Sequence, residues 1–86
     1  MKVINKRVDM IAIFYKNGNI RPYKFKFYEG DNEVKITVDT LQFSDKIKRV
    51  GEVVLTYRCQ STIHNILRIY ELHYIPQKLE WYLYKI

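Results

Sequence analysis

One cysteine and two histidines are the side chains best suited to covalent or metal chemistry in this chain: Cys59, His64 and His73. A thiolate nucleophile needs a base within hydrogen-bond reach, and a closed zinc site needs four converging ligands. Strand alternation predicts that Cys59 faces a core and that His73 lies on the opposite side of the same sheet, whereas His64 falls in a turn. Because these groups do not converge, we expect neither a catalytic site nor a metal site.

The remaining polar residues do not suggest a reaction either. The nine carboxylates are scattered along the chain, and no paired acid site emerges from the predicted registers. Only three glycines are present, and each is a turn or cap candidate, so there is no glycine-rich phosphate loop. We therefore expect no cofactor and no enzymatic activity.

The stretch RPYKFKFY at 21–28 alternates rings with lysines, which is typical of surfaces that stack on bases and contact phosphates. In a strand, however, the rings of Tyr23, Phe25 and Phe27 all point to one side, and we expect that side to be core. The lysines and the last tyrosine point outward. The candidate residues for contact with a nucleic acid are Lys24, Lys26, Tyr28, Lys35, Lys46, Lys48 and Arg49. The alternative is that they form only a solvated sheet face and a solvated charged loop.

The size and composition of the chain limit its domain number, its compartment and its partners. A chain of 86 residues, 48% of them hydrophobic, fits a single domain spanning 1–86. The lone cysteine cannot form an intramolecular disulfide and fits a reducing compartment. No signal peptide or membrane-length apolar run is present, so we expect a cytoplasmic protein with no membrane partner. The net charge of +6 favours a polyanionic partner, although an Ile-, Lys-, Tyr- and Asn-rich composition can also produce it.

Period-two segments rich in β-branched and aromatic residues predict an all-β domain of about six antiparallel strands, forming a small barrel or sandwich. The segments are 8–15, 20–29, 34–40, 53–62, 67–75 and 79–86. Turns are expected at Asn17-Gly18, Gly30-Asp31, His64-Asn65 and 76–78. One short helical turn is expected near 44–50, since Ser44 can cap its start and Gly51 can end it.

These turns fix registers that can be tested. A two-residue turn at 17–18 pairs Ala12 with Tyr23 and Met10 with Phe25, which makes one face of the first hairpin apolar. The turn at 30–31 continues this face by pairing Phe25 with Ile36. The turn at 64–65 gives a second apolar face, with Tyr57 opposite Leu72 and Cys59 opposite Tyr70. It also places Arg58 opposite Glu71, where we expect an ion pair.

The outer face of the first hairpin is expected to be apolar as well, and such a patch favours an interface. The candidate interface residues, including two outward tyrosines of the last strand, are Ile11, Ile13, Tyr15, Ile20, Pro22, Tyr82 and Tyr84. The alternative is that the segment 41–52, or Val3-Ile4, folds over this face.

Segments spread over nearly the whole chain also carry a resemblance to known proteins. They are KRVDMIAIF at 6–14, NGNIRPYKFKF at 17–27, YRCQS at 57–61, YELHY at 70–74 and WYLYKI at 81–86. In this layout the chain resembles a family of small uncharacterised bacterial all-β proteins. More loosely, the order Pro-x-x-Phe, Tyr-Arg, Tyr-Glu-Leu and Trp-x-Leu is similar to small domains encoded beside translesion DNA polymerases. Those domains have Phe-x-Trp where this chain has Phe25-Lys26-Phe27. The resemblance implies an all-β fold and carries over no catalytic residues.

We therefore expect a non-enzymatic β binding module, and two hypotheses for its partner remain open. In the first, it is a nucleic-acid-associated accessory protein that contacts phosphates through its basic sheet face and loop. In the alternative, it is a protein interaction module or a homodimer that uses the exposed apolar sheet face. Pairing of an exposed edge strand with another chain is a further route to a protein partner.

Overall fold

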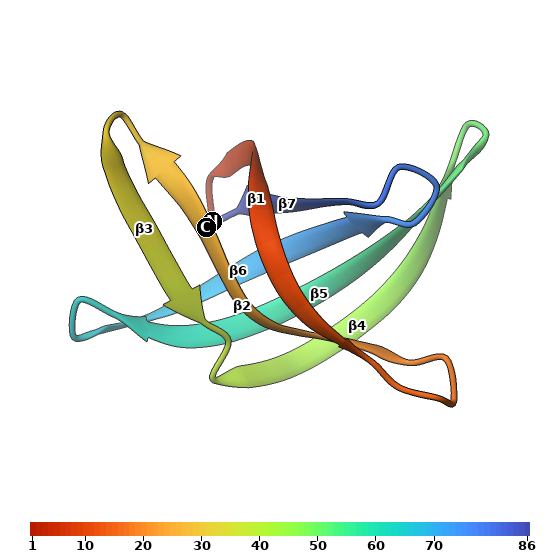
Figure 1. Cartoon of the computed structure of the whole chain (residues 1–86), viewed down its shortest axis with the longest axis horizontal. Helices are drawn as coiled ribbons and strands as arrows, with labels where there is room; N and C mark the ends of the chain where they lie inside the picture. Colours follow the sequence, from red (N-terminus) through yellow and green to blue (C-terminus); the bar gives the residue numbers. More distant parts are fainter.

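The computed structural model describes all 86 residues as one antiparallel sheet of seven strands, with no helix (Figure 1). The strands are β1 (Val3–Phe14), β2 (Ile20–Glu29), β3 (Asn32–Thr37), β4 (Thr40–Arg49), β5 (Glu52–Ile63), β6 (Ile66–Ile75) and β7 (Glu80–Lys85). Their order across the sheet is β3-β2-β1-β7-β6-β5-β4. The all-β prediction is confirmed, and the predicted count of six strands is one too low.

The additional strand is β4, which replaces the helical turn predicted near 44–50. Residues 40–49 pair with β5 along almost their whole length, from Thr40 opposite Gln60 to Arg49 opposite Glu52. Gly51 has a φ of 70°, but it serves the hairpin turn between β4 and β5 and does not end a helix. The prediction was wrong because a glycine in the left-handed region suits both kinds of chain reversal.

The two ends of the chain lie side by side, where β1 pairs with β7 (Figure 1). The backbone N–H of Lys2 donates to the carbonyl of Ile86 at 2.7 Å, and the N–H of Ile86 donates to the carbonyl of Lys2 at 3.0 Å. The two edge strands of the sheet, β3 and β4, are consecutive in the chain. The strand order is therefore that of a ring opened between β3 and β4.

The sheet is strongly curved but does not close into a barrel, and because it is a single sheet it is not a sandwich (Figure 1). Between β3 and β4 the chain turns a corner at Val38 and Asp39. The N–H of Val38 donates to Tyr23 of β2, and the N–H of Asp39 donates to Gln60 of β5. The Ser61 hydroxyl adds a 2.6 Å hydrogen bond to the carbonyl of Thr37. The two edges of the sheet are thus held together at this corner, and beyond it β2 and β4 do not pair.

The first hairpin differs from the prediction in register. Its loop has three residues, Lys16 to Gly18, instead of two: the N–H of Tyr15 donates to Asn19, and Gly18, with a φ of 95°, donates to Tyr15. This loop places Phe14 opposite Ile20 and Ala12 opposite Pro22.

A β-bulge in β2 then restores the predicted register. Ile11 lies opposite Lys24 and Ala12 opposite Pro22, so Tyr23 is the extra residue. Beyond the bulge Met10 faces Phe25, as predicted. Two predictions fail as a result: Pro22 is fully buried and does not point outward, and Tyr23 is 48% exposed and does not join the core.

The other registers are confirmed. Phe25 lies opposite Ile36 across the Gly30-Asp31 turn, and Cys59 lies opposite Tyr70 across the His64-Asn65 turn. At the latter turn both central residues have positive φ, 49° and 64°, as a type I′ turn requires. The strands on either side of each turn therefore present one continuous apolar face.

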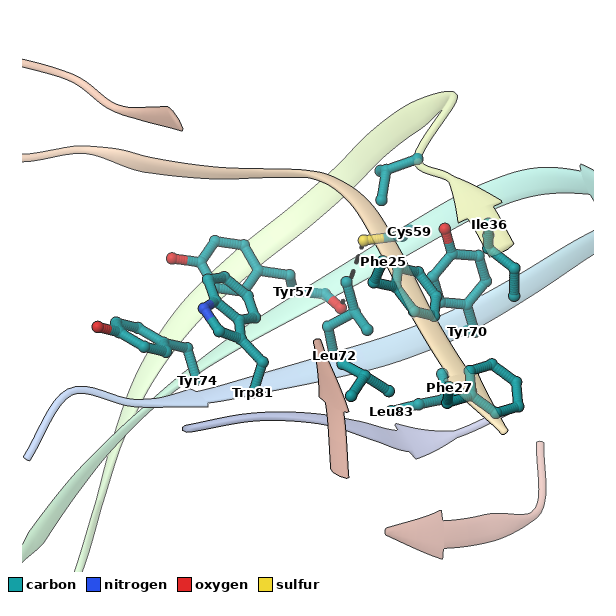
Figure 2. Packing of buried hydrophobic residues seen from close by; sticks show 12 residues of the cluster. Phe25, Phe27, Ile36, Tyr57, Cys59, Tyr70, Leu72, Tyr74, Trp81 and Leu83 are labelled. Atoms are coloured by element: carbon teal, nitrogen blue, oxygen red, sulfur yellow. Dashed lines mark hydrogen bonds between the residues drawn. The ribbon is translucent and has the colours of Figure 1, made fainter. Parts of the chain in front are cut away.

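The core fills the concave side of the curved sheet (Figure 2). Its twelve residues are Val8, Phe25, Phe27, Ile36, Val38, Tyr57, Cys59, Tyr70, Leu72, Tyr74, Trp81 and Leu83. Trp81 stacks on Tyr74 with ring centroids 4.6 Å apart and lies 5.5 Å from the ring of Tyr57. Most of these residues come from β5, β6 and β7 and from the Phe25–Phe27 part of β2. Burial of aromatic side chains therefore stabilises this small domain, which has no disulfide.

Candidate binding groove

A groove opens in the wall of the sheet beyond the corner, between β2 and β4. β3 ends at Thr37, so the Ile20–Pro22 part of β2 has no strand on that side. β4 pairs with β5 only, and its other edge is free. The groove, called here the β2–β4 groove, has a volume of about 630 Å³. It is lined by Tyr15, Gly18, Asn19, Ile20, Arg21, Leu41, Ser44, Asp45, Lys46, Leu55 and Tyr57.

The apolar part of the groove is continuous with the core. Ile20, Leu41 and Leu55 are partly buried and pack against the core cluster. Tyr57 is buried next to Trp81, and in Figure 2 its hydroxyl points in the same direction as that of Tyr74. Burial raises the pKa of Tyr57 to about 12, and the neighbouring Tyr74 and Cys59 act in the same direction. The phenol is therefore protonated at neutral pH and can only be a hydrogen-bonding group.

The polar part of the groove is cationic. Arg21 from β2 and Lys46 from β4 line it from opposite walls, and neither forms an ion pair with a carboxylate of the chain. Lys48 follows on β4, also without an ion pair, opposite Val53. Asp45 is the one carboxylate in the groove, and it accepts the N–H of Lys46 at 2.7 Å. The groove thus combines an apolar floor with unpaired positive charge, an arrangement suited to an anionic or amphipathic partner.

The predicted nucleic-acid contacts are divided between the two faces of the sheet. Lys24, Lys26 and Lys35 lie together on the convex face around a hollow of about 290 Å³. Lys46 and Lys48 instead lie opposite Leu55 and Val53, on the concave side of β4. A single strand of nucleic acid lying on one face cannot contact both groups.

Carboxylates offset part of the charge on the convex face. Asp9 lies opposite Lys26 and lines the same hollow. Glu33 binds the Lys35 ammonium at 3.3 Å and accepts the Tyr28 hydroxyl at 3.1 Å. These two partners, Lys35 first, hold the pKa of Glu33 below its usual value. Arg49 stands apart, on the convex side of β4 opposite Glu52.

The candidate interface residues do not form one patch. Ile11, Ile13 and Tyr15 are exposed, and neither Val3-Ile4 nor residues 41–52 cover them, because both segments are paired strands in the sheet. Ile20 lines the groove together with Tyr15. Pro22 is buried, as described above.

Tyr82 and Tyr84 belong to a different region of the convex face. Tyr82 lies opposite Arg7 of β1 and opposite His73 of β6, and its hydroxyl donates to Glu80 at 2.8 Å. Tyr84 stacks on the imidazole of His73 with ring centroids 4.0 Å apart. Both tyrosines are half-buried parts of a polar cluster.

His73 is buried within this cluster, although it lies on the side of the sheet predicted to face outward. Its Nε2 is 2.6 Å from a carboxylate oxygen of Glu71, and the other carboxylate oxygen lies 3.8 Å from the Lys85 ammonium. Burial lowers the pKa of His73, against the opposing effect of Glu71. The ion pair predicted between Arg58 and Glu71 is wrong: the two residues are opposite each other, but Glu71 binds His73 and Lys85 instead.

Cys59 is completely buried in the core. Its thiol hydrogen-bonds weakly to the carbonyl of Tyr57 at 3.8 Å. Burial raises the pKa of this thiol to about 12, while the positive charge of Arg21 acts in the opposite direction. The protonated thiol is a poor nucleophile. No group of three or more His, Cys, Asp or Glu side chains is arranged to hold a metal ion.

Sequence reasoning missed Arg21, Ser44, Leu41 and Leu55 as groove residues. Arg21 lies in the part of the first hairpin whose register the three-residue loop changes. The β4 residues were hidden by the helical interpretation. Alternation of Ser44, Lys46 and Lys48 with Phe43, Asp45 and Ile47 was the signal that could have revealed this strand.

Comparison of the chain with protein-family models, curated proteins and solved structures gives no match. The resemblance to small bacterial all-β proteins therefore stays a prediction from the sequence. No helix long and apolar enough to span a membrane is present.

Proposed function

We propose that the protein is a non-enzymatic interaction module that binds an extended segment of a partner protein as an added strand on β4. The observation that carries this proposal is the free edge of a ten-residue strand beside a groove of about 630 Å³. An exposed sheet edge presents unpaired N–H and C=O groups, which an extended peptide can satisfy. The groove then receives alternate side chains of that peptide.

The other free edge is a poorer candidate. β3 has six residues, against ten in β4, and its free edge adjoins a smaller hollow of about 300 Å³. Main-chain hydrogen bonds give affinity in strand addition, and pockets for alternate side chains give specificity. β4 offers more backbone groups for pairing and a larger groove for the alternate side chains.

Amide hydrogen exchange on the intact protein tests the proposal. The free protein is mixed with a panel of octapeptides with β-forming sequences, and exchange is followed residue by residue. We expect a binding peptide to slow exchange in β4, at residues 41–49, while the edge of β3 serves as an internal control and stays unchanged. If peptides bind without protecting β4, or protect β3 equally, the proposal is wrong.

Nucleic-acid binding remains a second candidate, favoured by one observation. The bulge exposes about half of Tyr23, beside Lys24, and Tyr28 is equally exposed further along β2. Two rings are therefore accessible near Lys24 and Lys26, and bases can stack on such rings. Fluorescence anisotropy of a labelled single-stranded oligonucleotide tests this, since affinity through phosphates must fall steeply between 50 and about 200 mM salt. Affinity that survives salt, or survives Lys24→Glu with Lys26→Glu, excludes this face.

A further inference from the structure

The two sides of β4 differ in chemistry, and this difference restricts what an added strand can be. On the concave side Ser44, Lys46 and Lys48 lie opposite Tyr57, Leu55 and Val53 of β5. On the convex side the row is Phe43, Asp45, Ile47 and Arg49, in which the two apolar residues, Phe43 and Ile47, are exposed, 60% and 36% respectively. An added strand places alternate side chains next to each of these rows.

Positive charge dominates the concave row and the wall across from it. Lys46 and Lys48 stand two residues apart on β4, and Arg21 lines the opposite wall of the groove. None of the three has a carboxylate partner within the chain. Charged side chains of this kind on an edge strand discourage indiscriminate pairing. These positive charges still allow pairing with a strand whose negatively charged side chains lie on the same face of the sheet.

The same charges disfavour a second copy of the chain as the occupant. A symmetric dimer through β4 is isologous, so that each β4 pairs with its own sequence running antiparallel. In the register with the two-fold axis at Ile47, continuous sheet faces place Lys46 of one copy opposite Lys48 of the other. Like charges opposed across strands destabilise the pairing.

Resting on the proposed function, we infer that the partner segment is an acidic strand with a carboxylate at every second residue. These carboxylates lie on the concave side and meet Arg21, Lys46 and Lys48. The intervening residues are apolar and lie on the convex side, against Phe43 and Ile47. The recognition element is therefore an alternating acidic and apolar stretch of about eight residues, which covers most of the ten-residue β4.

Peptides that differ only in charge or order test this inference. The probes are dye-labelled octapeptides: alternating Val-Glu, alternating Val-Gln, alternating Val-Lys, and a block peptide with four valines followed by four glutamates. Affinity is measured by fluorescence anisotropy at low and high salt. We expect the Val-Glu peptide to bind at least tenfold more tightly than the Val-Gln and block peptides, and the Val-Lys peptide not to bind.

Matched protein variants locate the charges responsible. Lys46→Glu with Lys48→Glu should abolish binding of the Val-Glu peptide and create binding of the Val-Lys peptide. Lys24→Glu with Lys26→Glu changes the net charge equally on the convex face and should leave both affinities unchanged. The fluorescence of buried Trp81 reports whether charge reversal disturbs folding. If it does, the double variant Lys46→Gln with Lys48→Gln replaces the charge-reversed protein in this test.

The outcomes separate the two proposals. Equal binding of the Val-Glu and Val-Gln peptides with protection of β4 overturns the acidic preference and leaves the proposed function standing. No peptide binding and no protection of β4 overturns both. Tighter binding of a single-stranded oligonucleotide that is lost in the Lys46/Lys48 variants also overturns the inference, because the groove then serves phosphates. A concentration-dependent dimer lost in the same variants overturns it in favour of a second copy.

Discussion

The imidazole of His73 lies on the convex face of the sheet, yet its neighbours leave only 4% of the residue exposed. It is bonded to Glu71 and stacked on Tyr84, and the positive charges of Arg49 and Lys85 act on it from nearby. Burial is the largest influence and lowers the pKa of His73 from its ordinary value of 6.5. In the folded protein the ring is therefore neutral under conditions that already protonate it in the unfolded chain.

This difference predicts that acid destabilises the fold. Below pH 6.5 the unfolded state binds a proton at His73 that the folded state does not bind. The free energy of unfolding therefore falls as the pH falls toward the folded pKa of His73. The slope for one such group is at most about 1.4 kcal/mol per pH unit. Urea unfolding at pH 7.5 and 5.5 measures this change in the free energy of unfolding.

Two variants identify the group responsible. His73→Gln retains a hydrogen-bond donor toward Glu71 but does not titrate, so its stability should change less between the two pH values than that of the parent protein. His64→Gln removes an exposed histidine from a turn and should keep the parent slope. Equal slopes in the parent protein and His73→Gln would show that His73 does not control acid stability in this range.

At the residue scale, the sequence predicted most core positions and failed where one residue shifts the register. Cys59, Tyr70, Phe25 and Ile36 lie where alternation placed them, because their hairpins have two-residue turns. Tyr23 does not, because a three-residue loop and a compensating bulge change the face on which neighbouring residues lie. Loop length and bulges depend on packing across the sheet, which local patterns do not contain.

Among the elements, the hairpin between β5 and β6 depends on an unusual backbone conformation. His64 and Asn65 both adopt positive φ, which costs most residues about 1–2 kcal/mol and suits asparagine and glycine better. Asn65→Val should destabilise the protein by about 1 kcal/mol, since β-branched residues tolerate this conformation poorly. Asn65→Gly should be neutral or stabilising. Asn32→Val, at an exposed strand position, is the matched control in thermal unfolding and should change little. Equal stability of Asn65→Val and Asn65→Gly contradicts the expectation.

β4 shows why an element, and with it the candidate groove, was only partly predictable. Every one of its residues except Leu41 is exposed, so the strand lacks the buried alternate face by which the other strands were recognised. Ser44 and Gly51 matched helix-boundary signals, but the ladder with β5 decides the conformation. The sequence thus identified Lys46, Lys48 and Arg49 as charged candidates and could not show that they lie on a free sheet edge.

Across the whole molecule, strands that are neighbours in the sheet are also neighbours in the sequence, except that β1 lies beside β7. The sheet is therefore a simple meander in which the chain begins and ends at an interior position. Reading β4-β5-β6-β7-β1-β2-β3 across the sheet follows the sequence, except for the break at the termini. Lys2 and Ile86 already form backbone hydrogen bonds with each other. The connection between β3 and β4, by contrast, joins the two edges of the sheet at the Val38–Asp39 corner.

This arrangement predicts that a circular permutant folds. A short Gly/Ser linker joins Ile86 to Met1, and the chain is opened between Asp39 and Thr40. The pairing of β1 with β7 becomes local, so the permutant should fold faster than the parent protein, because local contacts lower the entropic barrier. Stability should fall by about 1–2 kcal/mol, the value of one or two hydrogen bonds weakened at the corner.

Stopped-flow refolding followed by the fluorescence of Trp81 measures the rate, and urea unfolding measures the stability. A permutant with the same linker, opened instead between Arg68 and Ile69 within β6, is the control and should not fold, since it interrupts an interior strand. If the permutant opened at the corner is also unfolded, the tie between β3 and β4 is what holds the sheet curved. The separation of β2 from β4, and with it the shape of the β2–β4 groove, would then depend on the covalent connection at this corner.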